Sequence, residues 1–368
     1  MSSKNQLSKR YLSFFLLLSF VNYLTHAAYF NHQYELFAFL DNLWIFTSLA
    51  AYPLFYYYIR LLTVDEKINW KWSYIIYPAV LLSLFSFVLY FAMSPSFKEA
   101  YVYGVMYQKD AYDINTISII KLQIIKNTLF KIIFIIQVPL YAFWGCRMLR
   151  NFDHKMKNFY STIGHKNMSK VRWVLLAFVF ASIVSITSSA VGKDFFINKP
   201  NLLIIPAITH SLFLVAIITV GYFQDFTIIE YNKDAALVQS QDIDKAEQPP
   251  EQNKDCENVT KQCLEDLLQS KKIFTNLHLR ITDVAQLLGT NRTYVSRIVN
   301  EEMKTNFCDL INRYRINYAK ELMDNPENKH LSLHDIAISS GFASISSFYR
   351  VFTEMEKKSP GKYREIKR

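Results

Sequence analysis

The stretch ITDVAQLLGTNRTYVSRIVNEE, residues 281–302, has the pattern of two short helices joined by a tight turn. The apolar residues of the first helix fall on one helical face: Ile281, Val284, Ala285 and Leu288. Gly289 then stands where a helix end favours a positive φ, and Asn291 is a candidate N-cap for the second helix. The inward face of the second helix is expected to hold Val295, Ile298 and Val299. Its outward face carries Thr293, Ser296, Arg297 and Asn300.

The same arrangement recurs in LHDIAISSGFASISSFYRVFTEM, residues 333–355. Asp335 and Gly341 each follow their counterparts, Asp283 and Gly289, by 52 residues. The second helix of this copy is expected to bury Phe348, Val351, Phe352 and Met355. It presents Ser346, Tyr349, Arg350 and Thr353 outward. Between the copies, residues 306–323 predict one long helix. Two such units joined by a stiff helix can place helices in successive major grooves of DNA, about 34 Å apart.

These residues resemble the DNA-binding domain of the AraC/XylS transcription regulators. The matching pieces are VAQLLGTNRTYVSRIVNE, NFCDLINRYRINYAKELM and IAISSGFASISSFYRVF, the last followed by SPGKYR. That last piece is the most distinctive and keeps Gly341, Phe342, Phe348, Arg350, Phe352, Ser359, Pro360, Tyr363 and Arg364. The resemblance covers under a third of the chain. It implies sequence-specific DNA binding and promoter control.

Carried over by position, the resemblance implies base contacts from both helix-turn-helix units. In the first unit they fall to Arg292, Thr293, Ser296 and Arg297, and in the second to Ile345, Ser346, Tyr349 and Arg350. An arginine on a helix face is often only solvated. Arg297 and Arg350, however, occupy the same register of a repeated unit, which favours pairing with guanine. The predicted phosphate contacts are Tyr294, Asn300, Ser344, Lys362 and Arg364.

The chain departs from the family in two places. Lys357 stands two residues before the Ser-Pro pair, where the family often has Gly, so a strained or differently shaped turn is expected. The soluble ligand-binding and dimerising domain common in the family is replaced by an apolar segment. The family's usual sugar-type effector therefore does not follow from the resemblance.

That apolar segment lies before residue 225 and predicts a membrane domain. The 368-residue chain is 51% hydrophobic and only 20% charged, with a net charge of +10 that suits an anionic partner such as nucleic acid or lipid headgroups. A bilayer core needs about 20 apolar residues in a helix. Six stretches meet this length: 11–29, 37–62, 72–93, 127–149, 171–191 and 202–223.

The distribution of Lys and Arg predicts which loops face the cytoplasm. With the N-terminus inside, thirteen Lys and Arg fall in cytoplasmic segments against six outside. An even number of spans returns the C-terminus to the cytoplasm. The alternative for the first span is a cleavable signal peptide, because Lys4, Lys9 and Arg10 precede an apolar run that ends in small residues. This alternative leaves the C-terminus inside.

Few polar residues lie within the predicted spans. Asp41 and Lys131 are near span ends, where snorkelling explains them. His210 lies mid-span, where a buried hydrogen-bonding role is the commoner outcome and ligand binding the alternative. The outer segment 94–126 is rich in Tyr, which favours interfacial anchoring over a ligand-binding surface.

The predicted fold class is all-α, with a polytopic transmembrane domain over 1–230, a polar linker over 231–256 and a soluble helical domain over 257–368. The four cysteines show no metal-binding spacing, and neither a metal nor a cofactor is expected. The predicted function is a regulator in the bacterial inner membrane with its DNA-binding domain in the cytoplasm. The expected partners are double-stranded promoter DNA, the lipid bilayer, a second copy of the chain and an unidentified effector. The alternative is a transporter or channel with an accessory DNA-binding tail, and an enzyme has the least support.

Overall fold

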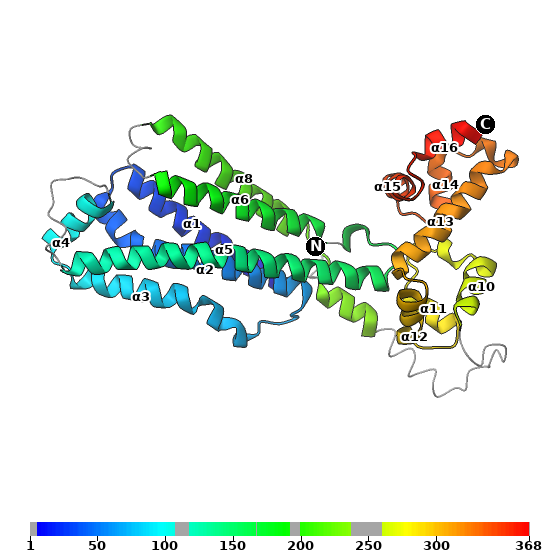
Figure 1. Cartoon of the computed structure of the whole chain (residues 1–368), viewed down its shortest axis with the longest axis horizontal. Coiled ribbons are helices and arrows are strands. Elements are labelled where there is room, and N and C mark those ends of the chain that lie inside the picture. Colours follow the sequence, from blue (N-terminus) through cyan, green and yellow to red (C-terminus); the bar gives the residue numbers. More distant parts are fainter. Residues whose placement is uncertain (1–5, 107–117, 167, 192–198, 237–259, 368) are drawn as a thin grey trace. The chain divides into compact units, whose positions relative to one another are not determined.

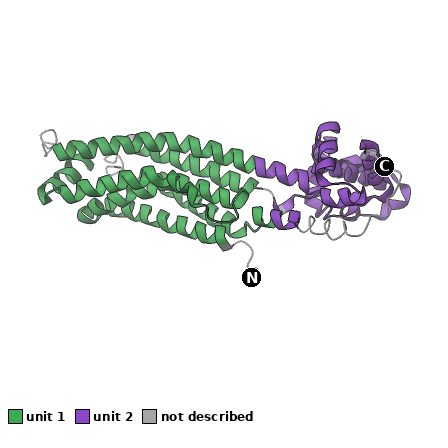
Figure 2. Cartoon of the chain, turned by 90° about the horizontal axis from the view of Figure 1, so that it is seen from below, with its two compact units in different colours: residues 1–150, 168–230 green, residues 151–167, 231–368 purple. Residues whose placement is uncertain are grey.

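The computed structural model describes residues 6–106, 118–166, 168–191, 199–236 and 260–367. Within these ranges every regular element is a helix, as predicted (Figure 1). The chain divides into two compact units (Figure 2). Unit 1 comprises residues 1–150 and 168–230, and unit 2 comprises 151–167 and 231–368. Unit 2 therefore includes the end of a helix that begins in unit 1, and the turn that follows that helix.

Unit 1 is a bundle of long helices. Its principal elements are α1 (Gln6–Phe30), α2 (Tyr34–Thr63), α3 (Tyr77–Ala92), α4 (Pro95–Ala100), α5 (Ser118–Phe159), α6 (Ser169–Val191) and α8 (Ile204–Phe223). Five helices of the described residues are long and apolar enough to cross a membrane: Leu7–Phe30, Trp70–Ala92, Ser118–Phe159, Ser169–Ser188 and Ile204–Ala236. They coincide with five of the six predicted spans.

The sixth predicted span, 37–62, lies in α2, which is helical throughout but is not among those five. α2 is buried along most of its length, with α1 and α3 packed against it, and it buries the polar residues Asp41 and Asn42. A helix enclosed by other helices does not present its side chains to the surroundings. Polar residues can therefore lower its hydropathy at little cost when they find partners inside the bundle.

Asp41 is not a snorkelling residue, contrary to the prediction. Its carboxylate lies 3.5 Å from the ammonium of Lys126, and both side chains are buried. Lys126 also donates to the hydroxyls of Ser86 and Tyr101, at 3.2 and 3.3 Å. Helix α5 begins at Ser118, nine residues before the predicted span, and so brings Lys126 into the bundle as a partner for Asp41. The tyrosines 107 and 112 of the predicted outer segment lie outside the described residues.

Unit 2 consists of short helices on either side of one longer helix. The elements are α10 (Lys261–Lys271), α11 (Ile281–Leu287), α12 (Arg292–Arg297), α13 (Phe307–Asp324), α14 (Leu333–Ser339), α15 (Ile345–Glu356) and α16 (Pro360–Lys367), with a π-helical turn over Ile298–Glu302. A further helix covers 228–236 and extends into the predicted linker, whereas residues 237–259 lie outside the described ranges. α13 is the predicted connecting helix.

The inward faces predicted for the two repeats are buried except at Leu288, which is half-buried, and at Met355. Val295, Ile298, Val299, Phe348, Val351 and Phe352 are each at most 5% exposed. Met355 is 37% exposed, so its prediction as a core residue is wrong. It lies in the last turn of α15, and the buried face of that helix ends at Phe352.

Candidate nucleic-acid interface

The first helix-turn-helix is formed by α11 and α12. Gly289 has φ +65°, in the left-handed region that the sequence predicted for the helix end. The Asn291 side chain accepts the backbone N–H of Tyr294 at 2.9 Å, which confirms it as the N-cap of α12. The turn and the cap together fix the direction in which α12 leaves the first helix.

The second helix-turn-helix is formed by α14 and α15 and repeats this local chemistry. Asp335 and Ser332 form a capping box at the start of α14, and Ser344 caps α15. Gly341 has φ +89°, and a Cβ at this position would lie only 2.7 Å from the carbonyl oxygen of Thr275. Any other residue at 341 would be both strained and in contact with backbone.

Most of the predicted base-contacting residues lie at the surface of unit 2. Thr293, Arg297, Ser346, Tyr349 and Arg350 are exposed, whereas Arg292, Ser296 and Ile345 are half-buried. The Arg297 guanidinium lies over the Tyr294 ring, 4.5 Å from its centroid. Arg350 has only a loose contact, 3.7 Å, with Glu354, and both side chains are 71% exposed. These two arginines can be redirected toward a ligand at little cost.

Ser296 and Asn300 form a pair rather than two independent contacts. The Asn300 amide donates to the Ser296 hydroxyl at 3.0 Å. If Ser296 contacts a base and Asn300 a phosphate, as predicted, the hydrogen bond between them must either persist in the complex or break.

Arg292 is held by residues that precede the helix-turn-helix in the chain. Its Nη2 donates to the Tyr231 hydroxyl at 2.9 Å, and its guanidinium lies over the Phe159 ring, 4.8 Å from the centroid. The Phe159 and Tyr231 rings are buried and meet edge to face at 5.2 Å. Arg292, predicted to contact a base, is thus engaged by the end of α5 and by the helix over 228–236.

The two predicted phosphate-contacting residues of α16 differ in their surroundings. Lys362 is exposed. Arg364 is half-buried and donates to the backbone carbonyls of Leu331, Lys329 and Asn328, at 2.8, 3.0 and 3.5 Å. These bonds tie α16 to the turn that precedes α14. The guanidinium of Arg364 thus serves the packing of unit 2, and this argues against the predicted phosphate contact.

Arg315 is a central residue that the sequence reasoning missed. It is 1% exposed, and its five N–H donors all have acceptors. Nε and Nη2 donate to the carbonyls of Phe274 and Asn276, at 2.7 and 2.9 Å. The remaining donors reach Ser161 and Thr162, in the turn after α5. Burial lowers the pKa of Arg315 to about 10, so the side chain stays charged at neutral pH. Arg315 lies four residues from Ile311 and from Ala319, which both face inward. This spacing indicates from the sequence that Arg315 shares their buried face.

The turn after α5 also pairs with the backbone that precedes α11. Tyr160 and Arg280 form an isolated antiparallel bridge, and the Ser161 N–H donates to the Leu279 carbonyl at 3.1 Å. The Tyr160 hydroxyl donates to Asp234 at 2.6 Å, and Asp234 also accepts from Arg280 at 3.3 Å. Residues 159–162 and 231–234, hereafter the docked segments, are thus joined to each other and to the first helix-turn-helix.

The turn at Lys357 has the conformation that the family's glycine would favour. Lys357 has φ +55° and ψ +15° and caps the C-terminus of α15. Of the two expectations for this turn, strain or a different shape, the structure supports strain. The turn keeps its shape, but a residue with a side chain occupies a left-handed position.

Comparison with known proteins agrees with this geometry. A family model described as a helix-turn-helix domain matches residues 284–366. The C-terminal domain is an AraC-type helix-turn-helix domain. The Msm operon regulatory protein of Streptococcus mutans is 30% identical over 100 residues, which are 26% of this chain and 35% of that protein. The Melibiose operon regulatory protein of Escherichia coli K12 is 33% identical over 88 residues, 24% of this chain and 28% of that protein.

The match is confined to this part of the chain. It spans about a third or less of the length of these two curated relatives. A solved structure from Listeria innocua, of unknown function, aligns with 30% of this chain and all of its own at 27% identity, with a TM-score of 0.26. Among the residues that the structure describes, no group of three His, Cys, Asp or Glu is placed to hold a metal ion.

Proposed function

We propose that the protein is a transcription regulator anchored in the bacterial inner membrane, which binds promoter DNA in the cytoplasm through its two helix-turn-helix units. The observation that carries this proposal is the contrast between the surfaces of the two units. Helices of unit 1 expose large apolar side chains, such as Phe91 at 70% and Leu212 at 64%. Such surfaces are rare on soluble proteins and suit lipid. The outward faces of α12 and α15 carry arginines and small polar residues instead.

The second part of the proposal is that the docked segments restrain DNA binding. Helix α5 runs without interruption from Ser118 to Phe159, so the helix that contains the predicted span 127–149 ends at a residue that contacts Arg292. Tyr231 follows α8 by eight residues and supplies the second contact. A change in either helix that withdraws these aromatic side chains frees Arg292 for DNA. We further propose that the active species is a homodimer.

The DNA-binding part is tested with the full-length protein in lipid nanodiscs. Rounds of selection from a random DNA duplex pool, followed by footprinting, should yield one sequence protected in two adjacent major grooves. Recovery of only random sequences at low salt would show that the protein does not read DNA sequence.

The topology is tested by reporter fusions. A reporter that is active only in the cytoplasm, fused at residue 240, should be active in cells. Activity there of a reporter that works only in the periplasm would overturn the proposal, because chromosomal DNA is not in that compartment.

One observation in unit 1 favours the alternative of a transporter. The buried Lys126–Asp41 pair and its hydroxyl neighbours form a polar network inside helices that otherwise suit lipid. Such groups mark transport pathways in some membrane proteins. Proteoliposomes that accumulate a solute only when Asp41 is intact would support this function, whereas the absence of any flux favours regulation.

A further inference from the structure

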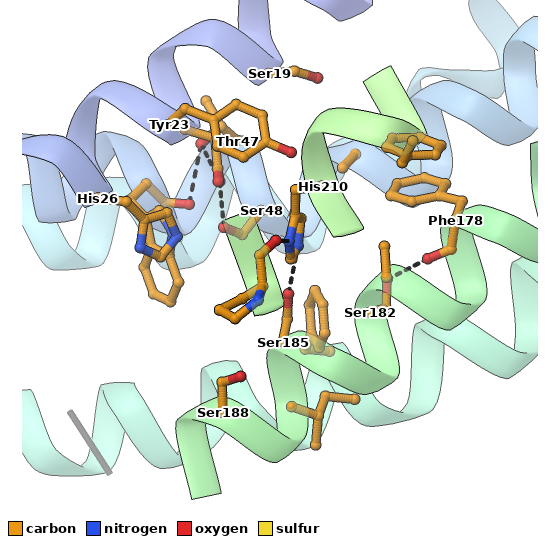
Figure 3. Close-up of a pocket in the computed structure, with 18 of the residues that line it drawn as sticks. Ser19, Tyr23, His26, Thr47, Ser48, Phe178, Ser182, Ser185, Ser188 and His210 are labelled. Atoms are coloured by element: carbon orange, nitrogen blue, oxygen red, sulfur yellow. Dashed lines mark hydrogen bonds between the residues drawn. The ribbon is translucent and has the colours of Figure 1, made fainter. Parts of the chain in front are cut away.

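Unit 1 contains a cavity of about 810 Å³ between α1, α2, α5, α6 and α8 (Figure 3). Pockets that bind small molecules measure about 300–1,000 Å³. The two histidines within the predicted spans, His26 and His210, both line this cavity. Polar side chains are costly in membrane helices and are generally functional there.

The first polar group of the cavity is formed by His210 and Ser185. Nδ1 of His210 lies 2.6 Å from the Pro206 carbonyl oxygen, and Nε2 lies 2.8 Å from the Ser185 hydroxyl. A carbonyl oxygen can only accept, so Nδ1 carries the proton. In the neutral ring Nε2 then accepts the proton of Ser185. The oxygen of Ser185 is left with its lone pairs as acceptors at the cavity wall (Figure 3).

The second polar group is formed by Asn22, Thr47 and Ser48. The Asn22 amide donates to the Thr47 hydroxyl at 3.1 Å and to the Ser48 hydroxyl at 2.7 Å. Both amide hydrogens are thereby used, and the Asn22 carbonyl oxygen is an acceptor. Helices α1 and α6 thus each present an acceptor oxygen, of Asn22 and of Ser185.

Aromatic side chains form much of the remaining wall. The rings of Tyr52 and Phe178 stack with a separation of 4.2 Å and an interplanar angle of 2°, and Phe178 stacks on Phe213 at 4.6 Å and 11°. Among the described residues that line the cavity, Lys131 is the one charged side chain, and none is acidic. A cation would therefore find no counter-charge here.

We propose that this cavity is the effector site, and that its ligand is a ring compound without positive charge that carries hydroxyl or N–H donors. The aromatic side chains supply apolar contact for the ring, and Ser185 and Asn22 accept its donors. The assignment of the ligand as the effector rests on the proposed regulatory function, but binding itself does not depend on DNA.

The test uses 2-naphthol as the probe. Naphthalene, which has the same ring system without the hydroxyl donor, and benzyltrimethylammonium, a cation, are the control compounds. Full-length protein in nanodiscs is titrated by calorimetry, and the signal of protein-free discs is subtracted to remove partition into lipid. We expect 2-naphthol to bind, naphthalene to bind more weakly and the cation not to bind.

Ser185→Ala should weaken 2-naphthol about three- to tenfold, the effect of one net hydrogen bond, and leave naphthalene unchanged. Ala207→Trp, which places an indole ring in the cavity, should weaken binding of both. Ser13→Ala is the matched control, because Ser13 is exposed, does not line the cavity and donates to the Lys9 carbonyl.

Three results would overturn the inference: no signal above protein-free discs, equal losses of both ring probes in Ser185→Ala, or a co-purified lipid chain that 2-naphthol does not displace. DNA binding of the same preparations is measured in parallel. If DNA binds but no probe does, the cavity assignment fails while the regulatory function stands. If the probe binds but DNA does not, the ligand site stands while the regulatory function fails.

Discussion

The guanidinium of Arg292 donates a hydrogen bond of 2.9 Å to the hydroxyl of Tyr231, 61 residues earlier in the chain. Arg292 begins the helix that is predicted to enter the major groove, and Tyr231 lies in the helix that follows α8. An arginine cannot keep this bond and also place the same donor on a guanine. The bond would therefore compete with the base contact predicted for Arg292.

Replacing Tyr231 with Phe should raise the affinity of the full-length protein for its operator. The substitution removes the acceptor of the Arg292 donor but keeps the ring that packs on Phe159. The expected gain is about ten- to hundredfold, the value of one hydrogen bond to a charged group. Fluorescence anisotropy with the selected operator measures it.

The double variant of Tyr231→Phe with Arg292→Ala is the control for this prediction. If the gain comes from freeing Arg292, Tyr231→Phe should have no effect once Arg292 is absent. An equal gain in both backgrounds would show that Tyr231 acts by another route.

Arg297→Ala and Arg350→Ala should each reduce operator affinity and relax preference at one base. Both side chains are exposed and outside the buried faces of their helices, so the fold should persist. Loss of an arginine–guanine pair costs about 1–3 kcal/mol on the operator and much less on a scrambled duplex. Equal losses on both duplexes in anisotropy titrations would mean that the arginines contact only the backbone.

Arg364→Ala should lower the free energy of unfolding by about 1–3 kcal/mol, because the carbonyls of Leu331 and Lys329 lose a charged donor. Lys362→Ala is the matched control, since Lys362 is exposed on the same helix and should leave stability unchanged. If Lys362 contacts a phosphate, its loss reduces the salt slope of DNA binding by about one. Thermal unfolding of both variants separates the two roles, and equal stability would contradict the assignment.

Lys357→Gly should stabilise unit 2 by about 0.5–1 kcal/mol. Glycine adopts the positive φ of this position without the cost of a Cβ, and that gain exceeds its larger loss of backbone entropy. Lys358→Gly, one residue later and outside the positive-φ region, should be destabilising. Denaturant titrations of the pair test the prediction, which fails if both glycines lower the unfolding free energy.

The contribution of Lys166 to the stability of unit 2 should increase between about pH 8 and pH 10. The Lys166 ammonium lies over the Tyr160 ring, 3.4 Å from its centroid, and burial lowers its pKa to about 8. The unfolded chain keeps the ordinary value of 10.5. Between these values the unfolded chain binds more protons than the folded protein, so stability rises with pH. Lys166→Met removes this unfavourable buried charge and should stabilise unit 2 at neutral pH. Its effect should therefore shrink as the pH rises, as measured by thermal unfolding midpoints.

The local features of the helix-turn-helix units could be predicted because they depend on near neighbours. The positive φ of Gly289 and the cap at Asn291 follow from residues within one turn. The faces of α12 and α15 follow from periodicity, which separates Val295 from Arg297 without knowledge of the rest of the chain. The error at Met355 arose because periodicity does not tell where the packing partner ends.

The contacts of Arg292, Arg315 and Asp41 could not be predicted, because their partners lie far away in the sequence. Periodicity indicates that Arg315 faces inward, but it does not identify Ser161, which lies 154 residues earlier, as its partner. The same holds for Asp41, whose charge was interpreted from its place in one helix. Its partner Lys126 comes from another helix, and only tertiary packing brings the two together.

The bonds from Arg315 to Ser161 and Thr162 have a consequence for proteolysis. A protease that cuts between residues 237 and 259 would sever the peptide chain but not these contacts, since residues 160–162 stay in place within unit 2. The cleaved DNA-binding fragment would still be held by these contacts, and a fragment that did leave would lose three of the five hydrogen bonds of Arg315. If the protein acts as proposed, release of a soluble transcription factor by cleavage at these residues is therefore disfavoured.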